Sequence, residues 1–151
     1  MLSLLLIALS QPVETDLVAD VRAALDAEQK AFFCGDCDST VTYWSEDMEM
    51  VVEGERRATS PGDLRSLCEG VMQMVADGRI PSGASGPRVI ERRIEMLGEA
   101  MAYETVLRET PAGMKSSVTK LIVREPEGWR IRRMHEALAR PSPAGSERPS
   151  D

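Results

Sequence analysis

The sequence predicts an α+β fold in which helices come first and an antiparallel sheet follows. Before residue 77, apolar residues recur every three or four positions, as they do in amphipathic helices. From residue 88 onward, four runs of strand length alternate with short turns. Between the two halves, residues 77–87 (DGRIPSGASGP) are rich in Gly, Pro and Ser, which favours an irregular connection.

Length and composition indicate one globular domain. A chain of 151 residues fits a single core, and 42% hydrophobic with 28% charged residues is too apolar for a disordered chain. The formal charge of −7 argues against a nucleic-acid backbone or an anionic membrane surface as the main partner. No motif in the sequence indicates a cofactor.

The N-terminus is apolar but short. The run MLSLLLIALS is well below the ~20 residues that cross a bilayer, so we expect no membrane anchor. Ala8 and Ser10 form a small-x-small cleavage pattern, although no Lys or Arg precedes the run. We therefore expect residues 1–12 to be a signal peptide of an exported (periplasmic or secreted) protein. The alternative is a misassigned start or an apolar arm on a cytoplasmic protein. The domain itself is expected at 13–140, with a disordered tail at 141–151.

The helical half contains two well-marked helices. Residues 15–33 follow the helical period, with Thr15 or Asp16 available as a cap and Gly35 at the end. A second, short helix is predicted at 36–44 and a brief strand at 48–52. Ser60 and Pro61 then open a helix whose apolar stripe includes Cys68. The strands that follow are expected at 88–97, 101–110, 115–124 and 129–138.

The three cysteines allow at most one internal disulfide. A bridge from Cys34 or Cys37 to Cys68 is consistent with export, and the sequence leaves the pairing open. Cys34 and Cys37 form a CxxC pair that follows a helix instead of opening one, which does not favour a thioredoxin-like thiolate. Three Cys with His135 match no known zinc spacing, so no metal site is predicted.

Two stretches of the chain carry a family likeness. The first is YWSEDMEMV at 43–51, followed by SPGDLR at 60–65; the second is SVTKLIV at 117–123, followed by GWRI at 128–131 and Met134-His135. Together they resemble the nuclear transport factor 2-like superfamily, in particular its SnoaL-like group, over residues 15–138. The resemblance implies a cone-shaped, cystatin-like roll, in which a curved, mostly antiparallel sheet wraps around a long N-terminal helix beside a pocket. Ala137 departs from the usual pattern, which has a Ser there.

Fold alone does not settle function, because this superfamily includes isomerases, dehydratases, cyclases and oligomerisation modules. The sequence favours a small-ligand-binding or oligomerisation domain with no assignable reaction, whose ligand would be a small hydrophobic molecule. The alternative is an isomerase-, dehydratase- or cyclase-like enzyme that uses His135 as acid or base together with Tyr103.

Strict strand alternation predicts the pocket residues. It places Arg133 and His135 on the face of Trp129 and Ile131, where His135 would act as a general base or, alternatively, only as a structural residue. The same reasoning turns Tyr103 inward. The predicted pocket residues are Tyr43, Trp44, Met101, Thr119, Trp129, Ile131 and Arg133.

No catalytic carboxylate can be placed in that pocket. Glu104 is out of phase with Tyr103 and is expected on the outer face, and Glu91 and Glu95 share a solvated face with Arg93. The predicted outer face also carries arginines and apolar residues, which is typical of a homodimer contact through the sheet. These residues are Arg88, Ile90, Arg92, Ile94, Met96, Arg130 and Arg132. The alternative is a solvated face with salt bridges to Glu104 or Glu136.

Overall fold

The computed structural model describes residues 12–80, 86–110 and 113–139. Residues 1–11 and 140–151, which hold most of the predicted signal peptide and the predicted tail, lie outside this description. The elements in chain order are α1 (Pro12–Phe33), α2 (Cys37–Val41), β1 (Trp44–Val52), β2 (Glu55–Ala58), α3 (Pro61–Ala76), β3 (Arg88–Met96), β4 (Met101–Glu109), β5 (Lys115–Glu125) and β6 (Gly128–Ala139). No helix among the described residues is long and apolar enough to span a membrane.

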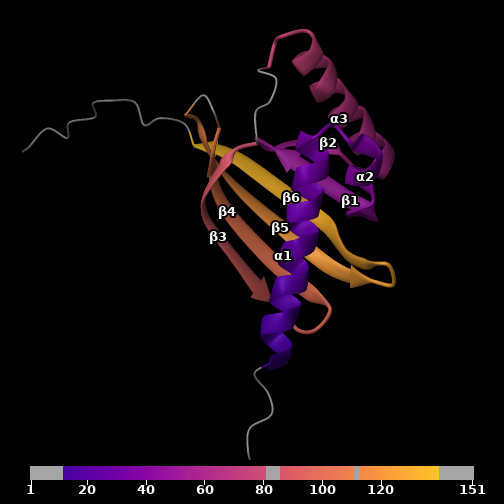
Figure 1. The fold of residues 1–151 in the computed structure, drawn as a ribbon, viewed down its shortest axis with the longest axis vertical. Helices are drawn as coiled ribbons and strands as arrows, with labels where there is room; N and C mark the ends of the chain where they lie inside the picture. The colour runs from indigo at the N-terminus through magenta and orange to yellow at the C-terminus, as the bar shows by residue number, and fades with distance from the viewer. Residues whose placement is uncertain (1–11, 81–85, 111–112, 140–151) are drawn as a thin grey trace, which may run out of the picture.

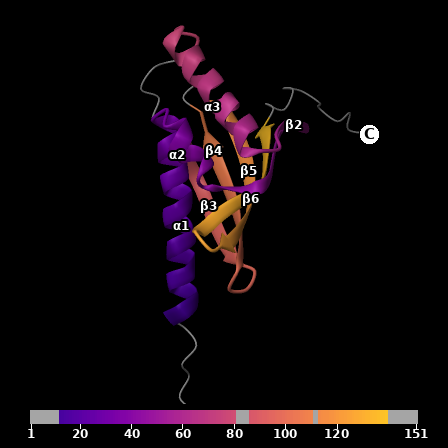
Figure 2. The ribbon, with the colours of Figure 1, turned by 90° about the vertical axis from the view of Figure 1, so that its right-hand side faces the viewer.

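The strands form one curved, mostly antiparallel sheet in the order β2-β1-β6-β5-β4-β3. The pairing of β1 with β6 is parallel, and the other pairings are antiparallel. α1 lies across one face of the sheet (Figure 1), and the view turned by 90° shows helix and sheet as separate layers (Figure 2). We call the face that carries α1 the inner face and the opposite one the outer face. The predicted α+β class is confirmed.

The β1–β2 hairpin differs from the prediction. The second helix ends at Val41, and β1 begins at Trp44 because Tyr43 and Trp44 already pair with β6: the Ile131 N–H donates to the Tyr43 carbonyl (2.8 Å). β2 was not predicted. Its two-residue turn, Glu53 and Gly54, has positive φ at both positions (54° and 77°), as tight hairpins that follow the strand twist require.

The start of α3 confirms the predicted capping residues. Ser60 has an extended backbone (φ −151°), and its hydroxyl accepts a hydrogen bond from the Asp63 N–H (3.1 Å). The Asp63 carboxylate in turn accepts one from the Thr59 N–H (3.0 Å). Pro61 occupies the first turn, where its missing N–H costs nothing. The helix therefore begins where its orphan donors are satisfied.

The core lies between α1, α3 and the inner face. Val21 and Leu25 of α1 are buried against the sheet, and Leu64 is the residue of α3 that belongs to this core cluster. The sheet contributes Trp44, Met48, Met50, Ala58, Ala102, Val118, Ile122, Trp129, Ile131 and Met134. Complete burial of such side chains contributes about 1.5–3 kcal/mol each, so this layer is the main source of stability.

A β-bulge divides β6 into two halves. Ile131 pairs with Ile122 and Arg133 pairs with Leu121, so Arg132 is an extra residue opposite no partner on β5. One extra residue reverses the alternation of the strand. Trp129 and Ile131 face inward before it, and Met134 faces inward after it.

Candidate functional site

A cavity of about 180 Å³ opens between the C-terminal half of α1, α3 and the inner face of the sheet. One part of its wall is apolar. The other part is built from charged and amide side chains. The lining residues are Glu28, Gln29, Phe32, Phe33, Met50, Val52, Leu67, Arg108, Lys120, Met134 and Glu136.

Glu28 and Lys120 form the first ion pair of the polar wall. Glu28 lies on the buried stripe of α1 and is only 7% exposed. Its two carboxylate oxygens are engaged: Oε1 accepts from the Trp44 indole N–H (3.1 Å) and Oε2 accepts from Lys120 Nζ (3.3 Å). The cost of burying this carboxylate is offset because both of its oxygens have hydrogen-bond or ion-pair partners.

Glu104 extends this pairing behind the cavity. It is 1% exposed, with Arg92 Nε at 2.5 Å and Lys120 Nζ at 4.0 Å. Arg92 also donates to Asp26 of α1 (2.5 Å). Burial opposes the charged guanidinium, but the hydrogen bond to Asp26 and the charge of Glu104 outweigh it and raise the pKa of Arg92 above its ordinary value. The charges therefore form a chain that runs from α1 across β3, β4 and β5.

Arg108 and Glu136 form a second ion pair at the cavity. The Arg108 guanidinium donates to Glu136 Oε1 (2.7 Å) and to the Ser116 hydroxyl (3.1 Å). Both charged side chains are mostly buried, at 20% and 15% exposed. A small adjoining cavity of about 20 Å³ shares Gln29, Arg108 and Lys120 with the first, so the polar wall reaches deeper along the inner face.

The predicted position of His135 is wrong. His135 and Arg133 lie on the outer face and are exposed, because the bulge at Arg132 reverses their orientation relative to Trp129 and Ile131. His135 pairs with Thr119 of β5 and Val51 of β1. Within β6, the residues that reach the cavity are Met134 and Glu136.

The predicted inward positions of Tyr103, Met101 and Thr119 are also wrong. Tyr103 is 37% exposed and Met101 41%, while the alternate residues of β4 face α1. Alternation shows which residues share a face, but not which face is covered by a helix. The expected outer position of Glu104 is wrong for the same reason. The expected outer position of Arg92 is wrong as well, because its side chain is only 13% exposed. Ile94 and Met96, which share its face, pack against the core.

The other predicted pocket residues belong to the core. Trp44, Trp129 and Ile131 are buried, and Tyr43 packs against them. None of the seven predicted residues lines the cavity, although Trp44 supports it through its hydrogen bond to Glu28.

The residues that do form the polar wall had a signal in the sequence. Glu28 follows Val21 and Leu25 at helical spacing, so a charged residue occupies a position of the helix where the pattern predicts an apolar one. On β5, Lys120 lies on the same face of the strand as Val118 and Ile122, because the three residues are spaced two apart. A charged residue in phase with an apolar face indicates a buried ion pair, which the hydrophobic pattern alone does not reveal.

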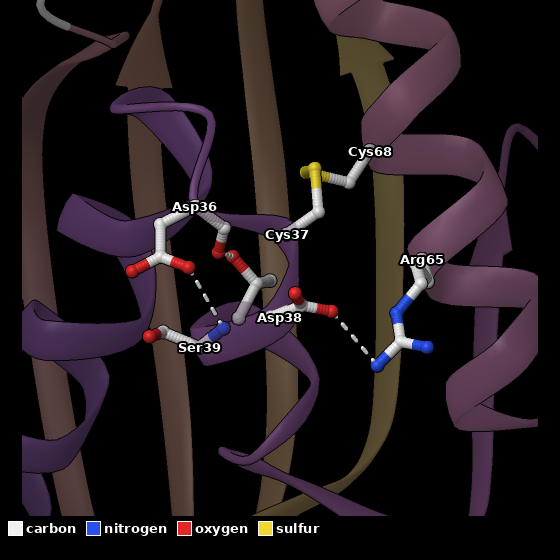
Figure 3. The surroundings of a disulfide bond; sticks show 7 residues. Asp36, Cys37, Asp38, Ser39, Arg65 and Cys68 are labelled. Atoms are coloured by element: carbon white, nitrogen blue, oxygen red, sulfur yellow. Dashed lines mark hydrogen bonds and ion pairs between the residues drawn. A yellow bond between two sulfur atoms is a disulfide. The ribbon is translucent and has the colours of Figure 1, made fainter.

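A disulfide joins α2 to α3, the helix that contributes Leu67 to the cavity. Cys37 at the start of α2 is bonded to Cys68 of α3, with Cα atoms 5.7 Å apart, while Cys34 is free and exposed. This settles the open pairing. Around the bond, Asp36 caps α2 through the Ser39 N–H (3.0 Å), and Arg65 contacts Asp38 at 2.9 Å (Figure 3).

A wider hollow beside the disulfide is a weaker candidate. It encloses about 430 Å³ next to α2 and α3. Its lining is mainly polar and includes the acidic residues Asp36, Asp38 and Glu69. No group of three His, Cys, Asp or Glu side chains in the described part of the chain is arranged to hold a metal ion.

Comparison with solved structures identifies the fold. A DUF3225-family protein of unknown function from Pectobacterium atrosepticum superposes with a TM-score of 0.68 at 22% identity, covering 83% of this chain and 92% of that one. A nuclear transport factor 2-like protein with a cystatin-like fold from Novosphingobium aromaticivorans gives 0.64 at 20%, covering 87% of each chain. A provisionally assigned dehydratase of the nuclear transport factor 2-like family from Streptomyces avermitilis gives 0.66 at 16%, covering 85% and 99%.

No family model and no curated protein sequence matches the chain. The structural likeness shows that the chain has the cystatin-like fold of nuclear transport factor 2-like proteins, as the resemblance implied. No reaction follows from that fold.

Proposed function

We propose that this protein binds a small, uncharged, mostly apolar organic molecule in the cavity between α1, α3 and the inner face. The observation that carries the proposal is the division of the cavity into an apolar wall and a wall of paired charges. Ligand sites in proteins typically combine an apolar surface with a few fixed polar groups, which orient the ligand.

Size and charge narrow the ligand class. A cavity of about 180 Å³ is close to the ~150 Å³ that accommodates benzene in an engineered protein core, so a single ring or a short chain fits. The charges of Arg108 and Lys120 are balanced by those of Glu136 and Glu28. An ion would disturb these pairs, whereas a hydroxyl or carbonyl group can share their hydrogen bonds without displacing a partner.

The binding test uses single-ring ketones and phenols as probes and follows amide chemical shifts by NMR. We expect shifts in residues around Phe32, Leu67 and Met134, with affinities in the range of small fragments. Leu67→Trp, which fills the cavity from α3, should abolish them. Leu97→Trp, at an exposed position in the turn between β3 and β4, is the matched control and should leave them unchanged. Shifts that map to the outer face, or that survive Leu67→Trp, would refute the proposal.

The geometry gives little support to the alternative that the protein is an enzyme. An isomerase-, dehydratase- or cyclase-like reaction with His135 as acid or base would need this residue in the cavity, and it lies on the other face of the sheet. Proton transfer inside the cavity would instead depend on Glu28 or Glu136, each held in an ion pair. Turnover of a bound ketone that is lost in Glu136→Gln and retained in His135→Ala would favour such an enzyme.

We further propose that the outer face mediates a homodimer. Its central residues are apolar or β-branched and half-buried or exposed in the single chain: Tyr103, Thr105, Leu107, Thr119 and Leu121. A surface of this kind is typical of a protein contact, and a two-fold axis would bring the same patch of two copies together. Sedimentation equilibrium of Leu107→Glu should show a monomer, whereas Ala23→Glu on α1 should stay dimeric. A wild-type monomer would refute the proposal.

Export remains part of the proposed function. The Cys37–Cys68 disulfide supports it, because such bonds persist in oxidising compartments outside the cytosol. Mass spectrometry of the mature protein tests it: an intact Met1 would contradict cleavage.

A further inference from the structure

The disulfide and the free cysteine lie close together in the chain. Cys34 and Cys37 are separated only by Gly35 and Asp36, and the positive φ of Gly35 (76°) turns the chain between α1 and α2. Cys34 is exposed, whereas Cys37 and Cys68 are buried. A free thiol thus stands three residues from one sulfur of an existing disulfide.

The bond is also an important anchor of α3. The buried residues of this helix are Leu64 and Cys68, both 0% exposed. Leu67, next to Cys68, lines the cavity, and Phe32 and Phe33 line it from the end of α1, immediately before Cys34. The Cys37–Cys68 bond therefore ties α3, which carries one wall of the cavity, to α2.

We propose that Cys34 is the internal nucleophile of a thiol–disulfide exchange that releases α3 and opens the cavity. The Cys34 thiolate attacks Cys37 Sγ, the Cys34–Cys37 bond forms, and the Cys37–Cys68 bond breaks. The electron pair leaves on Cys68 Sγ, which takes a proton from water. One disulfide and one thiol are present before and after the step, so no oxidant or reductant is needed.

The exchange would regulate ligand binding in the cavity, and this part of the inference rests on the proposed function. Once Cys68 is released, α3 loses its covalent link to α2 and keeps Leu64 in the core, Leu67 beside it and the Arg65–Asp38 ion pair. We expect a probe bound in the cavity to lose affinity by about tenfold, within the usual range of coupling between two sites. The thiol chemistry itself can be tested without any ligand.

The first experiment maps the disulfide in the full chain. Oxidised protein is incubated over a range of pH, quenched in acid, labelled with N-ethylmaleimide after denaturation and digested for mass spectrometry. We expect label on Cys68 and a Cys34–Cys37 peptide to accumulate faster as pH rises, because the thiolate is the attacking species. Label confined to Cys34 under all conditions would overturn the proposal.

Two variants separate the exchanged and original states. Cys68→Ser leaves Cys34–Cys37 as the possible internal bond and imitates the exchanged form, whereas Cys34→Ser retains Cys37–Cys68 and cannot exchange. In hydrogen exchange of the complete chain, residues 69–76 should lose protection in Cys68→Ser and keep it in Cys34→Ser. Equal protection in both variants would overturn the proposal. If the NMR probes fail to bind wild-type protein, the ligand proposal fails, and the disulfide map and α3 protection still decide this one.

Discussion

The two faces of β4 and β5 differ in where their charged and apolar side chains lie: the inner face combines apolar core residues with buried charges, and the outer face exposes large apolar and aromatic side chains. The inner face buries Glu104, Arg108 and Lys120 beneath α1, while the outer face exposes Tyr103 and Met101. The buried charges are compensated by partners from α1, β3 and β6. Burial in this protein therefore follows ion pairing as well as hydrophobicity, and the polar wall of the cavity is part of the folded core.

The largest expected effect is the loss of Glu104. Glu104→Leu leaves the guanidinium of Arg92 beside a gap in the buried network, with only the exposed Asp26 as partner, and should lower the free energy of unfolding by about 3–5 kcal/mol. The outer-face change Met101→Ala, at a side chain that is 41% exposed, should cost about 1 kcal/mol or less. Urea unfolding of both variants measures the difference. Equal losses would show that the two faces are energetically alike.

The second prediction compares adjacent residues of β6 after the bulge. Met134→Ala creates a hole beside the cavity and should cost about 2–5 kcal/mol of unfolding free energy. His135→Ala removes an exposed side chain and should change it by less than about 0.5 kcal/mol. Thermal and urea unfolding give both values. A larger loss for His135→Ala would mean that the reversed orientation after Arg132 is incorrect.

The smallest expected effect on stability concerns Asp63, whose carboxylate is exposed, unlike the buried carboxylates of the inner face. The hydrogen bonds from the backbone N–H and hydroxyl of Thr59, together with Ser60, hold the pKa of Asp63 below its ordinary value. The ionised Asp63 carboxylate therefore stabilises the folded state fully at pH values above its pKa in the unfolded chain, which is near 4. This stabilisation is lost as the pH falls through the lower pKa of the folded state. The Tm difference between wild type and Asp63→Asn should be constant from pH 5 to 7 and should shrink below about pH 4. A difference that persists at pH 2 would contradict this role.

Most of the fold was predictable because local signals and tertiary structure agree. The Ser60–Pro61 start, the helical stripe of α1 and the four C-terminal strands each appear within a few residues of their expected bounds. β2 was missed because its sequence, ERRA, has no apolar alternation, and its pairing with β1 depends on the Glu53–Gly54 turn.

The candidate site was less predictable because the side of the sheet that a helix covers is a tertiary property. Tyr103 is more apolar than Glu104, so alternation and hydrophobicity together select the wrong face of β4 unless the ion pairs of Glu104 are known. The inward turn of Met134 depends on Arg132, an extra residue that pairs with nothing on β5 and looks ordinary in the sequence. Phase arguments along a strand hold only as far as the next irregularity of its ladder.

The bulge at Arg132 bears on how roles are transferred between related chains. In a relative whose last strand lacks this extra residue, the residue aligned with His135 would face the helices, whereas in this chain it faces away from them. An alignment without a gap at this position would then assign to His135, which faces outward, the role of a residue that faces inward in the relative. For this strand, a correct correspondence follows the Cα pairing with β5, and it places Met134 and Glu136, not His135, at the positions that line the cavity.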